Sequence, residues 1–421
     1  MLLKKLIKNC PKNAQKIDIS GLALDSRDIK KGNLFFALRG KKYNGEKFVN
    51  DALIKGAKVI IVSKNSKIKN KYIPIIKVSN IKDILTYACI KFFKHKPKNI
   101  ILVTGTNGKS SVAEFFYQIL TLNKTSVASI GTLGIKTNKT NKKTNLTSPN
   151  IISLHSELEK IKKSNIDNVI IEASSHGLHQ GRLDGLDIKA GIFTNFSQDH
   201  LDYHKSMNSY FKAKMILFKR LVRKKGFIIL NSEIKEFNKI KKIGTSRKLK
   251  IIDIKNKKIF NEKNIVNLKG DFQKKNLLMS ILAANLCGVS SKKTSLITKD
   301  IKAVNGRLEL VRILLNKAKI FIDFAHTPHA LYTALKSLNK EYKSNITLVF
   351  GCGGERDKKK RPLMAKIAKQ FCKKIYITDD NPRNENPKKI RKELINVLKK
   401  DNYFDIGNRS LAIKTAIKKS Q

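Results

Sequence analysis

Tryptophan is absent from this 421-residue sequence, and cysteine and acidic residues are scarce. The five cysteines, Cys10, Cys89, Cys287, Cys352 and Cys372, form no CxxC pair, which argues against a disulfide framework or a cysteine zinc site. No apolar run approaches the roughly 20 residues that span a bilayer. The basic start MLLKKLIKNCPKN is too interrupted for a signal peptide. These absences predict a cytoplasmic protein without a membrane segment.

Acidic residues are far outnumbered by basic ones, 32 Asp and Glu against 88 Lys and Arg, so the formal net charge is +56. This charge suggests a nucleic-acid partner as one hypothesis. The lysines are spread over the whole chain together with many Asn and Ile, and aromatic residues make up only 7%. We therefore expect no specific nucleic-acid partner, and only a positive field that attracts anionic nucleotides.

The chain is long enough for two or three domains, and short β-rich runs alternate with helical stretches. This alternation is typical of an α/β protein with largely parallel sheets. We place the domains at residues 1–93, 94–308 and 309–421. The polar segment KTNKTNKKTNLTSPN predicts a loop. The clearest strand candidates are KVIIVSK, NIILVTG, NVIIEASSH, AGIFTNFS, GFIILNS, KIFIDFAH, NITLVFGCGG and KIYITDDNPR.

The strongest local pattern, NIILVTGTNGKSSVAEFFYQIL, reads as an apolar strand, a glycine turn and an amphipathic helix. Gly105 and Gly108 allow a tight turn whose amides face phosphate oxygens, and the helix start adds partial positive charge. Lys109 can contact the β- and γ-phosphates of ATP, and Ser110 can bind magnesium. Val103 occupies the first glycine position of GxxxxGK[ST], so the match is incomplete. A chance strand-to-helix turn is the alternative.

Two further polar residues follow predicted strands. Glu172 closes NVIIEASSH, and His200 lies in FTNFSQDHLDYH, beyond another strand. Ligands bind at the carboxyl ends of such strands, and oxygen and imidazole donors suit a magnesium or manganese ion. A solvated glutamate and a structural histidine are the alternatives. Lys214, in YFKAKMILF, reads from the residues alone as a solvated helix residue.

The sequence resembles the Mur ligase family, and within it the MurE-type branch. The resemblance covers almost the whole chain and rests on motifs in family order: LDSR, TGTNGKSS, EASSHGLHQGRL, FTNFSQDHLDYH, AKMILF, NGRLE, DFAHTP, GCGGERDKKKRPLM and DDNPR. It implies an α/β, three-domain architecture with a central phosphate-loop ATPase-like domain and a Rossmann-like C-terminal domain. The branch implies addition of a diamino acid to UDP-N-acetylmuramoyl-L-alanyl-D-glutamate in peptidoglycan synthesis.

The resemblance also implies an acyl-phosphate mechanism that consumes ATP and releases ADP. It assigns catalytic roles to Lys109, Glu172, His200 and Lys214, with Lys214 carbamylated. Magnesium would be held by Ser110, Glu172, His200 and the carbamylated Lys214. The implied ATP-binding residues are Gly105, Thr106, Asn107, Gly108, Lys109, Ser110, Ser111, Asn276, Arg307, Asp323 and His326.

Substrate positions also follow from the resemblance. Ser148 departs mildly from a Thr-Thr pair, and Ser110-Ser111 replaces another Thr-Thr pair but keeps the metal-binding hydroxyl. The implied UDP-substrate residues are Leu24, Ser26, Thr147, Ser148, Ser174, Gln180 and Arg182.

Arg356 and the DNPR segment, Asp380, Asn381, Pro382 and Arg383, would face the incoming amino acid. A guanidinium such as that of Arg383 can bind the distal carboxylate of meso-2,6-diaminopimelate in a bidentate pair, and lysine lacks this carboxylate. We therefore predict meso-diaminopimelate as the added amino acid. DDNPR also fits an ordinary turn, and both interpretations can hold.

One departure concerns the C-terminal end. Family members continue into a further strand and a GKGHE-like segment, whereas this sequence ends at Gln421 without that motif. The sequence is then a fragment, a truncated gene product, or a protein that closes the site differently. The alternatives are a non-catalytic nucleotide-binding homologue and a lysine-adding or folylpolyglutamate synthase-like ligase. We expect a monomer with small-molecule partners only.

Overall fold

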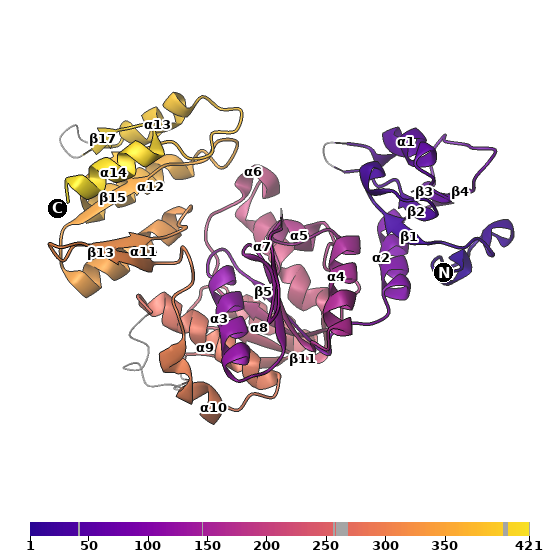
Figure 1. The fold of residues 1–421 in the computed structure, drawn as a ribbon, viewed down its shortest axis with the longest axis horizontal. Helices are drawn as coiled ribbons and strands as arrows, with labels where there is room; N and C mark the ends of the chain where they lie inside the picture. Colours follow the sequence, from indigo (N-terminus) through magenta and orange to yellow (C-terminus); the bar gives the residue numbers. More distant parts are fainter. Residues whose placement is uncertain (41–42, 145, 256, 258–267, 399–402, 421) are drawn as a thin grey trace. The chain divides into compact units, whose positions relative to one another are not determined.

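The computed structural model describes residues 1–40, 43–144, 146–255, 257, 268–398 and 403–420 (Figure 1). The chain forms two compact units. The first comprises Met1–Ile101, Ser126–Lys189 and Arg220–Arg223, and the second comprises Leu102–Thr125, Ala190–Lys219 and Lys224–Gln421. The three sequence-based domain boundaries stay a prediction.

The N-terminal part of the first unit is a parallel four-stranded sheet in the order β1-β2-β3-β4. Its strands are β1 (Gly21–Ala23), β2 (Asn33–Phe36), β3 (Val59–Ser63) and β4 (Ile75–Val78), and its helices are α1 (Val49–Ile54) and α2 (Ile81–Phe92). Every residue of β2 is buried, because both faces of the sheet are covered. One core includes Leu34, Phe36 and Ile61, and the other includes Phe35 and Ile60.

The largest sheet has eight strands in the order β12-β11-β10-β5-β9-β6-β7-β8. Strand β6 is parallel to β9 and β11 to β12, whereas β7 and β8 are antiparallel additions at one edge. The strands are β5 (Asn99–Thr104), β6 (Val127–Gly131), β7 (Gly134–Thr137), β8 (Asn141–Lys142), β9 (Asn168–Glu172), β10 (Ile188–Phe193), β11 (Val222–Leu230) and β12 (Lys250–Asp253).

The helices of this region begin at polar capping residues where the sequence supplies them. Asn150 caps α4 through Ser153 N, and Ser206 caps α7 through Ser209 N. Helices α3 and α9 lie against each other (Figure 1). The helices are α3 (Lys109–Leu122), α4 (Ile151–Lys163), α5 (Ser175–His179), α6 (Leu201–His204), α7 (Met207–Ile216), α8 (Phe237–Ser246), α9 (Asp271–Leu286) and α10 (Ser291–Leu296).

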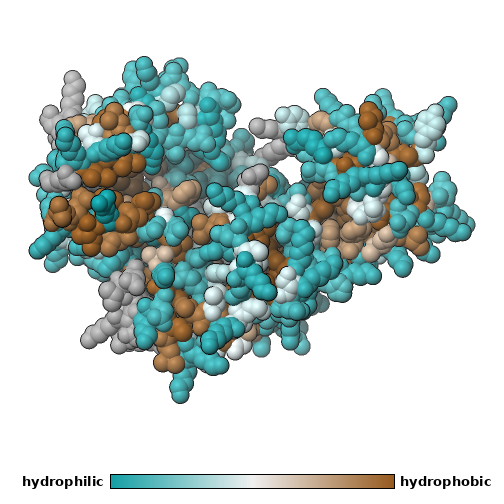
Figure 2. Space-filling view, in the orientation of Figure 1, coloured by the Kyte–Doolittle hydropathy of each residue, from teal (hydrophilic) through white to brown (hydrophobic). Residues whose placement is uncertain are grey.

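The C-terminal part contains an antiparallel pair, β13 (Glu309–Ile313) and β14 (Lys319–Ile322), and a parallel sheet in the order β15-β16-β17. The remaining elements are β15 (Ile346–Phe350), β16 (Cys372–Ile377), β17 (Tyr403–Asp405), α11 (Pro328–Tyr342), α12 (Lys360–Phe371), α13 (Pro387–Ile395) and α14 (Arg409–Lys418). Helices α11 and α13 each start with proline at the first position after a capping Thr327 or Asn386. Apolar side chains are exposed at the left of Figure 2, and on the β13–β14 hairpin they are Leu310, Val311, Ile313, Leu315 and Ile322.

Each of the eight strand candidates contains an observed strand, which confirms the alternating α/β pattern. The prediction of a loop over KTNKTNKKTNLTSPN was wrong for its first half. Residues up to Thr137 belong to β7, and Asn141–Lys142 form β8, because Thr137 and Thr140 close a tight turn between them. Among the described residues, every helix is too short or too polar to traverse a lipid bilayer.

Candidate nucleotide-binding and ligase site

The phosphate loop connects β5 to α3, as predicted. Gly105 has φ +146° and Gly108 has φ +85°, both in the range that favours glycine. A Cβ atom on Gly105 would lie 1.9 Å from Thr194 Oγ1, so no larger residue fits there. Helix α3 begins without a side-chain cap, so its first-turn amides are oriented for an anion.

Residues that follow β10 form hydrogen bonds to the phosphate loop. Asn195 accepts the amides of Thr106 (2.9 Å, through its carbonyl) and Asn107 (3.0 Å, through Oδ1). Thr194 Oγ1 donates to Asn107 O at 2.6 Å. The hydroxyl of Thr106 accepts the Ser197 amide at 3.0 Å. The backbone of the loop is therefore fixed by neighbouring protein groups.

Two lysines converge on one carbonyl of the loop. Lys109 Nζ donates to Gly105 O (3.0 Å) and Thr106 O (2.8 Å), and Lys214 Nζ donates to Gly105 O at 2.6 Å. Lys214 is only 1% exposed and lies over the Tyr210 ring. Burial, reinforced by the charge of Lys109, holds the pKa of Lys214 well below its usual range. The residue-based expectation of a solvated Lys214 was wrong, because α7 directs this side chain inward.

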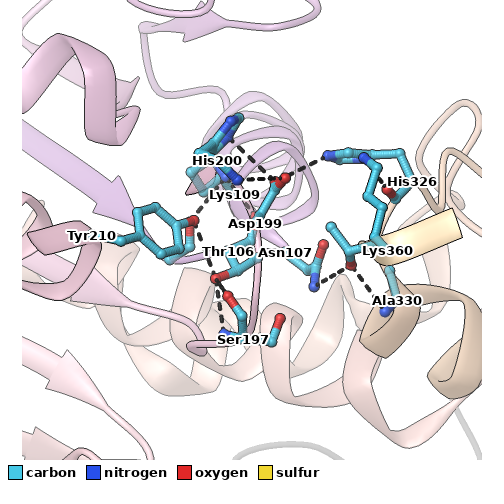
Figure 3. A network of polar contacts seen from close by, with 12 residues as sticks. Thr106, Asn107, Lys109, Ser197, Asp199, His200, Tyr210, His326, Ala330 and Lys360 are labelled. Carbon is cyan, nitrogen blue, oxygen red and sulfur yellow. Dashed lines mark hydrogen bonds and ion pairs between the residues drawn. The ribbon is translucent and has the colours of Figure 1, made fainter. Parts of the chain in front are cut away.

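Asp199 is the centre of a charged network beside the loop (Figure 3). This carboxylate is 4% exposed and lies 3.3 Å from His200 Nε2 and 3.4 Å from His326 Nε2. Burial opposes its ionisation, but the two histidines and Lys360 outweigh burial and lower the pKa of Asp199. Lys360 Nζ donates to His326 O at 2.7 Å. The network joins the loop before α6 to residues that precede α11 and begin α12.

The other predicted nucleotide residues gather around the start of α3. Arg307 Nη2 donates to Ser110 Oγ at 3.3 Å, and Asn276 Oδ1 lies 2.7 Å from the Cβ position of Gly108. Ser110 and its neighbour Ser111 are buried. Asp323 accepts the amides of Leu308 and Ala325 and so joins the chain before β13 to the chain after β14.

In the first unit, Glu172 and two predicted substrate residues form a second polar group. Glu172 is 2% exposed and accepts the amide (2.8 Å) and hydroxyl (3.1 Å) of Thr132. Ser148 Oγ donates to Glu172 O at 2.9 Å, lies 3.0 Å from Ser174 Oγ and accepts the Ser174 amide. The alternative interpretation of Glu172 as a solvated strand-end residue is therefore wrong.

Of the remaining predicted UDP-substrate residues, one set belongs to this polar group and the other follows β1. Arg182 donates to Ser148 O (2.8 Å) and to Gln180 Oε1, and Thr147 Oγ1 lies 3.2 Å from Thr132 Oγ1. Leu24 follows β1, and the following 3-10 turn begins at Ser26.

Four of the predicted amino-acid residues lie on loop 379–385 of the C-terminal part, and Arg356 directly follows loop 351–355. Arg356, Asp380, Asn381 and Arg383 are exposed, and Pro382 is half-buried. A Cβ on Gly354 would lie 1.9 Å from Pro382 O, so the two loop backbones approach closely at this glycine. Gly354 N donates to Asn381 O at 2.9 Å, and Arg383 Nη1 donates to Gly354 O at 2.5 Å.

The sequence-based prediction did not include Asn195, Asp199, Tyr210, Lys360 and Arg361. Asp199 stands directly before His200 in a quoted motif, and a charged residue there was a usable signal. Lys360 and Arg361 end a run of four basic residues, and nothing local marks these two as the buried ones.

A strand, a glycine turn and a helix that begins with Lys-Ser, set in a mainly parallel sheet, define a phosphate-loop α/β protein. Residues 18–97 match the Mur ligase family catalytic domain, residues 103–284 the Mur ligase middle domain, and residues 306–421 the Mur ligase glutamate ligase domain. A UDP-N-acetylmuramoyl-L-alanyl-D-glutamate–2,6-diaminopimelate ligase from Rickettsia bellii (strain RML369-C) is 39% identical over 430 residues, covering 96% of this chain and 88% of the relative. The chain therefore belongs to the Mur ligase family, and the resemblance inferred from its motifs is confirmed.

Solved structures agree with this family and its three-domain α/β architecture. A structure of a UDP-N-acetylmuramoyl-L-alanyl-D-glutamate–2,6-diaminopimelate ligase superposes with a TM-score of 0.69 at 26% identity, covering 100% of this chain and 91% of that one. A Mycobacterium tuberculosis folylpolyglutamate synthase gives a TM-score of 0.63 at 13% identity, covering 80% of this chain and 88% of that one. The second similarity concerns the fold alone.

Proposed function

We propose that this chain is an ATP-dependent ligase that joins meso-2,6-diaminopimelate to UDP-N-acetylmuramoyl-L-alanyl-D-glutamate. The observation that carries the proposal is the phosphate loop with a buried Lys214 that donates to its Gly105 carbonyl and whose pKa is lowered by burial. The identity of 39% to a diaminopimelate ligase over 96% of the chain supports the substrate assignment.

The phosphate-loop residues account for the first half-reaction. The terminal carboxylate of the UDP-linked dipeptide attacks the γ-phosphate of ATP, an acyl phosphate forms, and ADP leaves. The first-turn amides of α3 and the ammonium of Lys109 would hold the transferring phosphoryl group. Since this chemistry depends on positioning and charge neutralisation, a loop fixed by Asn195 and Thr194 is the required framework.

Lys214 fits the role of a carbamylated lysine. Only a neutral amine reacts with carbon dioxide, and burial favours the neutral form because it lowers the pKa of Lys214. The resulting carbamate would be an anion beside the ammonium of Lys109. Ser110 and His200 of the same unit would add a hydroxyl and an imidazole, and a donor set of this kind suits magnesium. Glu172 stays a predicted further donor. Bound Mg2+ would supply neutralisation of the phosphate charge.

The polar group of the first unit fits the dipeptide end of the UDP substrate. Arg182 is fixed by Gln180 and Ser148 and provides a cation for a substrate carboxylate. Thr147, Ser148 and Ser174 place three hydroxyls in one hydrogen-bonded group, which includes Thr132. Leu24 and Ser26 would contact the uridine part.

In the second half-reaction the amine of the amino acid attacks the acyl carbon, an amide bond forms, and inorganic phosphate leaves. Arg356 and Arg383 would bind the amino acid. Both are exposed, and Arg383 reaches the loop of Gly354. A guanidinium at this position favours a substrate with a distal carboxylate, because lysine would leave that guanidinium unpaired.

The test is phosphate release from ATP and magnesium with UDP-N-acetylmuramoyl-L-alanyl-D-glutamate. Three reactions are compared, with meso-diaminopimelate, with L-lysine and without amino acid. Release that requires diaminopimelate supports the proposal, and release that requires lysine overturns the choice of amino acid. No amino-acid-dependent release overturns the ligase assignment for this chain. Lys109→Met serves as the inactive control.

A cytoplasmic location follows from this proposal, because its nucleotide-linked substrate and ATP are cytoplasmic metabolites. A monomer stays our prediction. Gel filtration with light scattering tests the oligomeric state, and a stable dimer would contradict the prediction.

A further inference from the structure

The deepest buried charge of the C-terminal part belongs to Arg361, the second residue of α12. Its side chain is 1% exposed, although arginine is rarely buried without partners. Its guanidinium lies 3.1 Å from Glu385 Oε1 and 3.1 Å from Glu393 Oε2. A desolvated cation of this kind persists only because carboxylates compensate it.

Arg361 contacts loop 379–385, which carries four of the predicted amino-acid residues, and loop 351–355, which Arg356 follows. One nitrogen, Nη2, donates to Gly353 O at 3.3 Å and to both carboxylate oxygens of Glu385 at 3.1 Å. Gly353 belongs to loop 351–355, and Glu385 ends loop 379–385. The buried guanidinium of Arg361 therefore binds both loops and sets the distance between them.

Glu385 makes a further contact between the two loops. Its Oε1 accepts the amide of Glu355 at 2.5 Å, so the carboxylate also spans the loops. Burial opposes ionisation of Glu385, but the Glu355 amide and Arg361 outweigh burial and lower its pKa. On the exposed side, Lys358 lies 3.4 Å from the same carboxylate with a 64% exposed side chain.

The position of Arg383 depends on this arrangement. Arg383 has φ +51° and donates from Nη1 to Gly354 O, so its guanidinium is placed by loop 351–355 as well as by its own loop. A shift between the loops therefore moves the predicted carboxylate-binding group directly.

We propose that Arg361 is a positioning residue for amino-acid recognition: its buried guanidinium holds loops 351–355 and 379–385 at the separation that presents Arg383 to the distal carboxylate. This inference rests on the proposed function for its substrate, but the loop geometry is independent of turnover.

The experiment compares Arg361→Lys and Glu385→Gln with the matched surface control Lys358→Met. Arg361→Lys keeps a buried cation but cannot contact Gly353 and both glutamates together. We expect its KM for meso-diaminopimelate to rise about tenfold, since small misplacements of binding groups are costly. The KM for ATP should stay within about twofold. Glu385→Gln, which keeps the guanidinium, should give a smaller rise, and Lys358→Met should resemble the wild type.

Hydrogen–deuterium exchange on the same proteins provides the readout that needs no activity. Peptides covering residues 351–355 and 379–385 should exchange faster in Arg361→Lys and unchanged in Lys358→Met. Unchanged exchange, or equal rises of KM for ATP and diaminopimelate, would overturn the inference. If the wild type shows no diaminopimelate-dependent phosphate release, the proposed function fails, and the exchange data alone decide whether Arg361 positions the loops.

Discussion

Lys214 and Arg361 are two basic side chains with the same 1% exposure and opposite surroundings. Lys214 contacts the Gly105 carbonyl and the Tyr210 ring, which carry no formal charge to balance an ammonium. Arg361 contacts the carboxylates of Glu385 and Glu393. Burial thus lowers the pKa of Lys214 and favours its neutral amine, whereas Arg361 stays a cation that two carboxylates compensate.

The difference separates a chemical role from a structural one. A buried lysine loses its proton readily, so it can act as a nucleophile toward carbon dioxide, whereas arginine stays protonated in proteins. An arginine with two carboxylates gives fixed geometry, and its removal leaves uncompensated charge. We therefore expect substitutions of Lys214 to affect turnover first, and substitutions of Arg361 to affect stability first.

The largest effect should follow Arg361→Met. Two carboxylates lose their buried partner, so the free energy of unfolding should fall by about 3–5 kcal/mol. Urea unfolding followed by circular dichroism measures this. A loss below about 1 kcal/mol, as for a surface pair, would show that the glutamates are solvated and that the contrast with Lys214 is wrong.

Lys214→Met should show the opposite pattern. Methionine removes one hydrogen bond and leaves no carboxylate without a partner, so the stability loss should be only about 1 kcal/mol. Turnover in the phosphate-release assay should fall by about 100- to 1000-fold, the usual cost of a lost electrostatic group. A carbamate signal in 13C NMR with labelled bicarbonate should vanish with it. Lys212→Met, an exposed lysine on the same helix, is the control, and near-wild-type turnover of Lys214→Met would refute the assignment.

The two side chains also show how far the sequence predicts this molecule. The strand–turn–helix of residues 99–122 could be predicted, because glycine spacing and apolar runs are local patterns. The burial of Lys214 and Arg361 could not, because both lie in basic surroundings and their burial depends on residues distant in sequence. Gly105 is 109 positions from Lys214, and Glu385 is 24 from Arg361. Only the family resemblance singled out Lys214.

A third buried base, His155 in the first unit, extends the comparison to pH. It is 0% exposed, its Nε2 lies 2.9 Å from Asp184 O, and burial followed by the charge of Lys96 lowers its pKa to about 4. The unfolded chain binds this proton near pH 6.5. Between pH 6.5 and 4 the unfolded chain therefore takes up a proton at His155 that the folded chain does not bind. The contribution of His155 to the free energy of unfolding is complete above pH 6.5 and falls by about 3 kcal/mol as the pH drops toward 4. Urea unfolding between pH 7.5 and 4 should give a shallower slope for His155→Gln, and equal slopes would contradict a neutral buried His155.

The smallest effect should follow Lys358→Met, and it separates burial from ion pairing. Lys358 and Arg361 bind the same carboxylate of Glu385, at 3.4 and 3.1 Å, but their side chains are 64% and 1% exposed. A solvated pair is screened and costs side-chain entropy, so its loss should reduce the free energy of unfolding by at most about 1 kcal/mol and less at high salt. Urea unfolding in low and high salt measures both quantities. If Lys358→Met reduced the free energy of unfolding as much as Arg361→Met, the number of ion pairs to Glu385 would decide stability. The burial of Arg361 would then not explain its larger contribution.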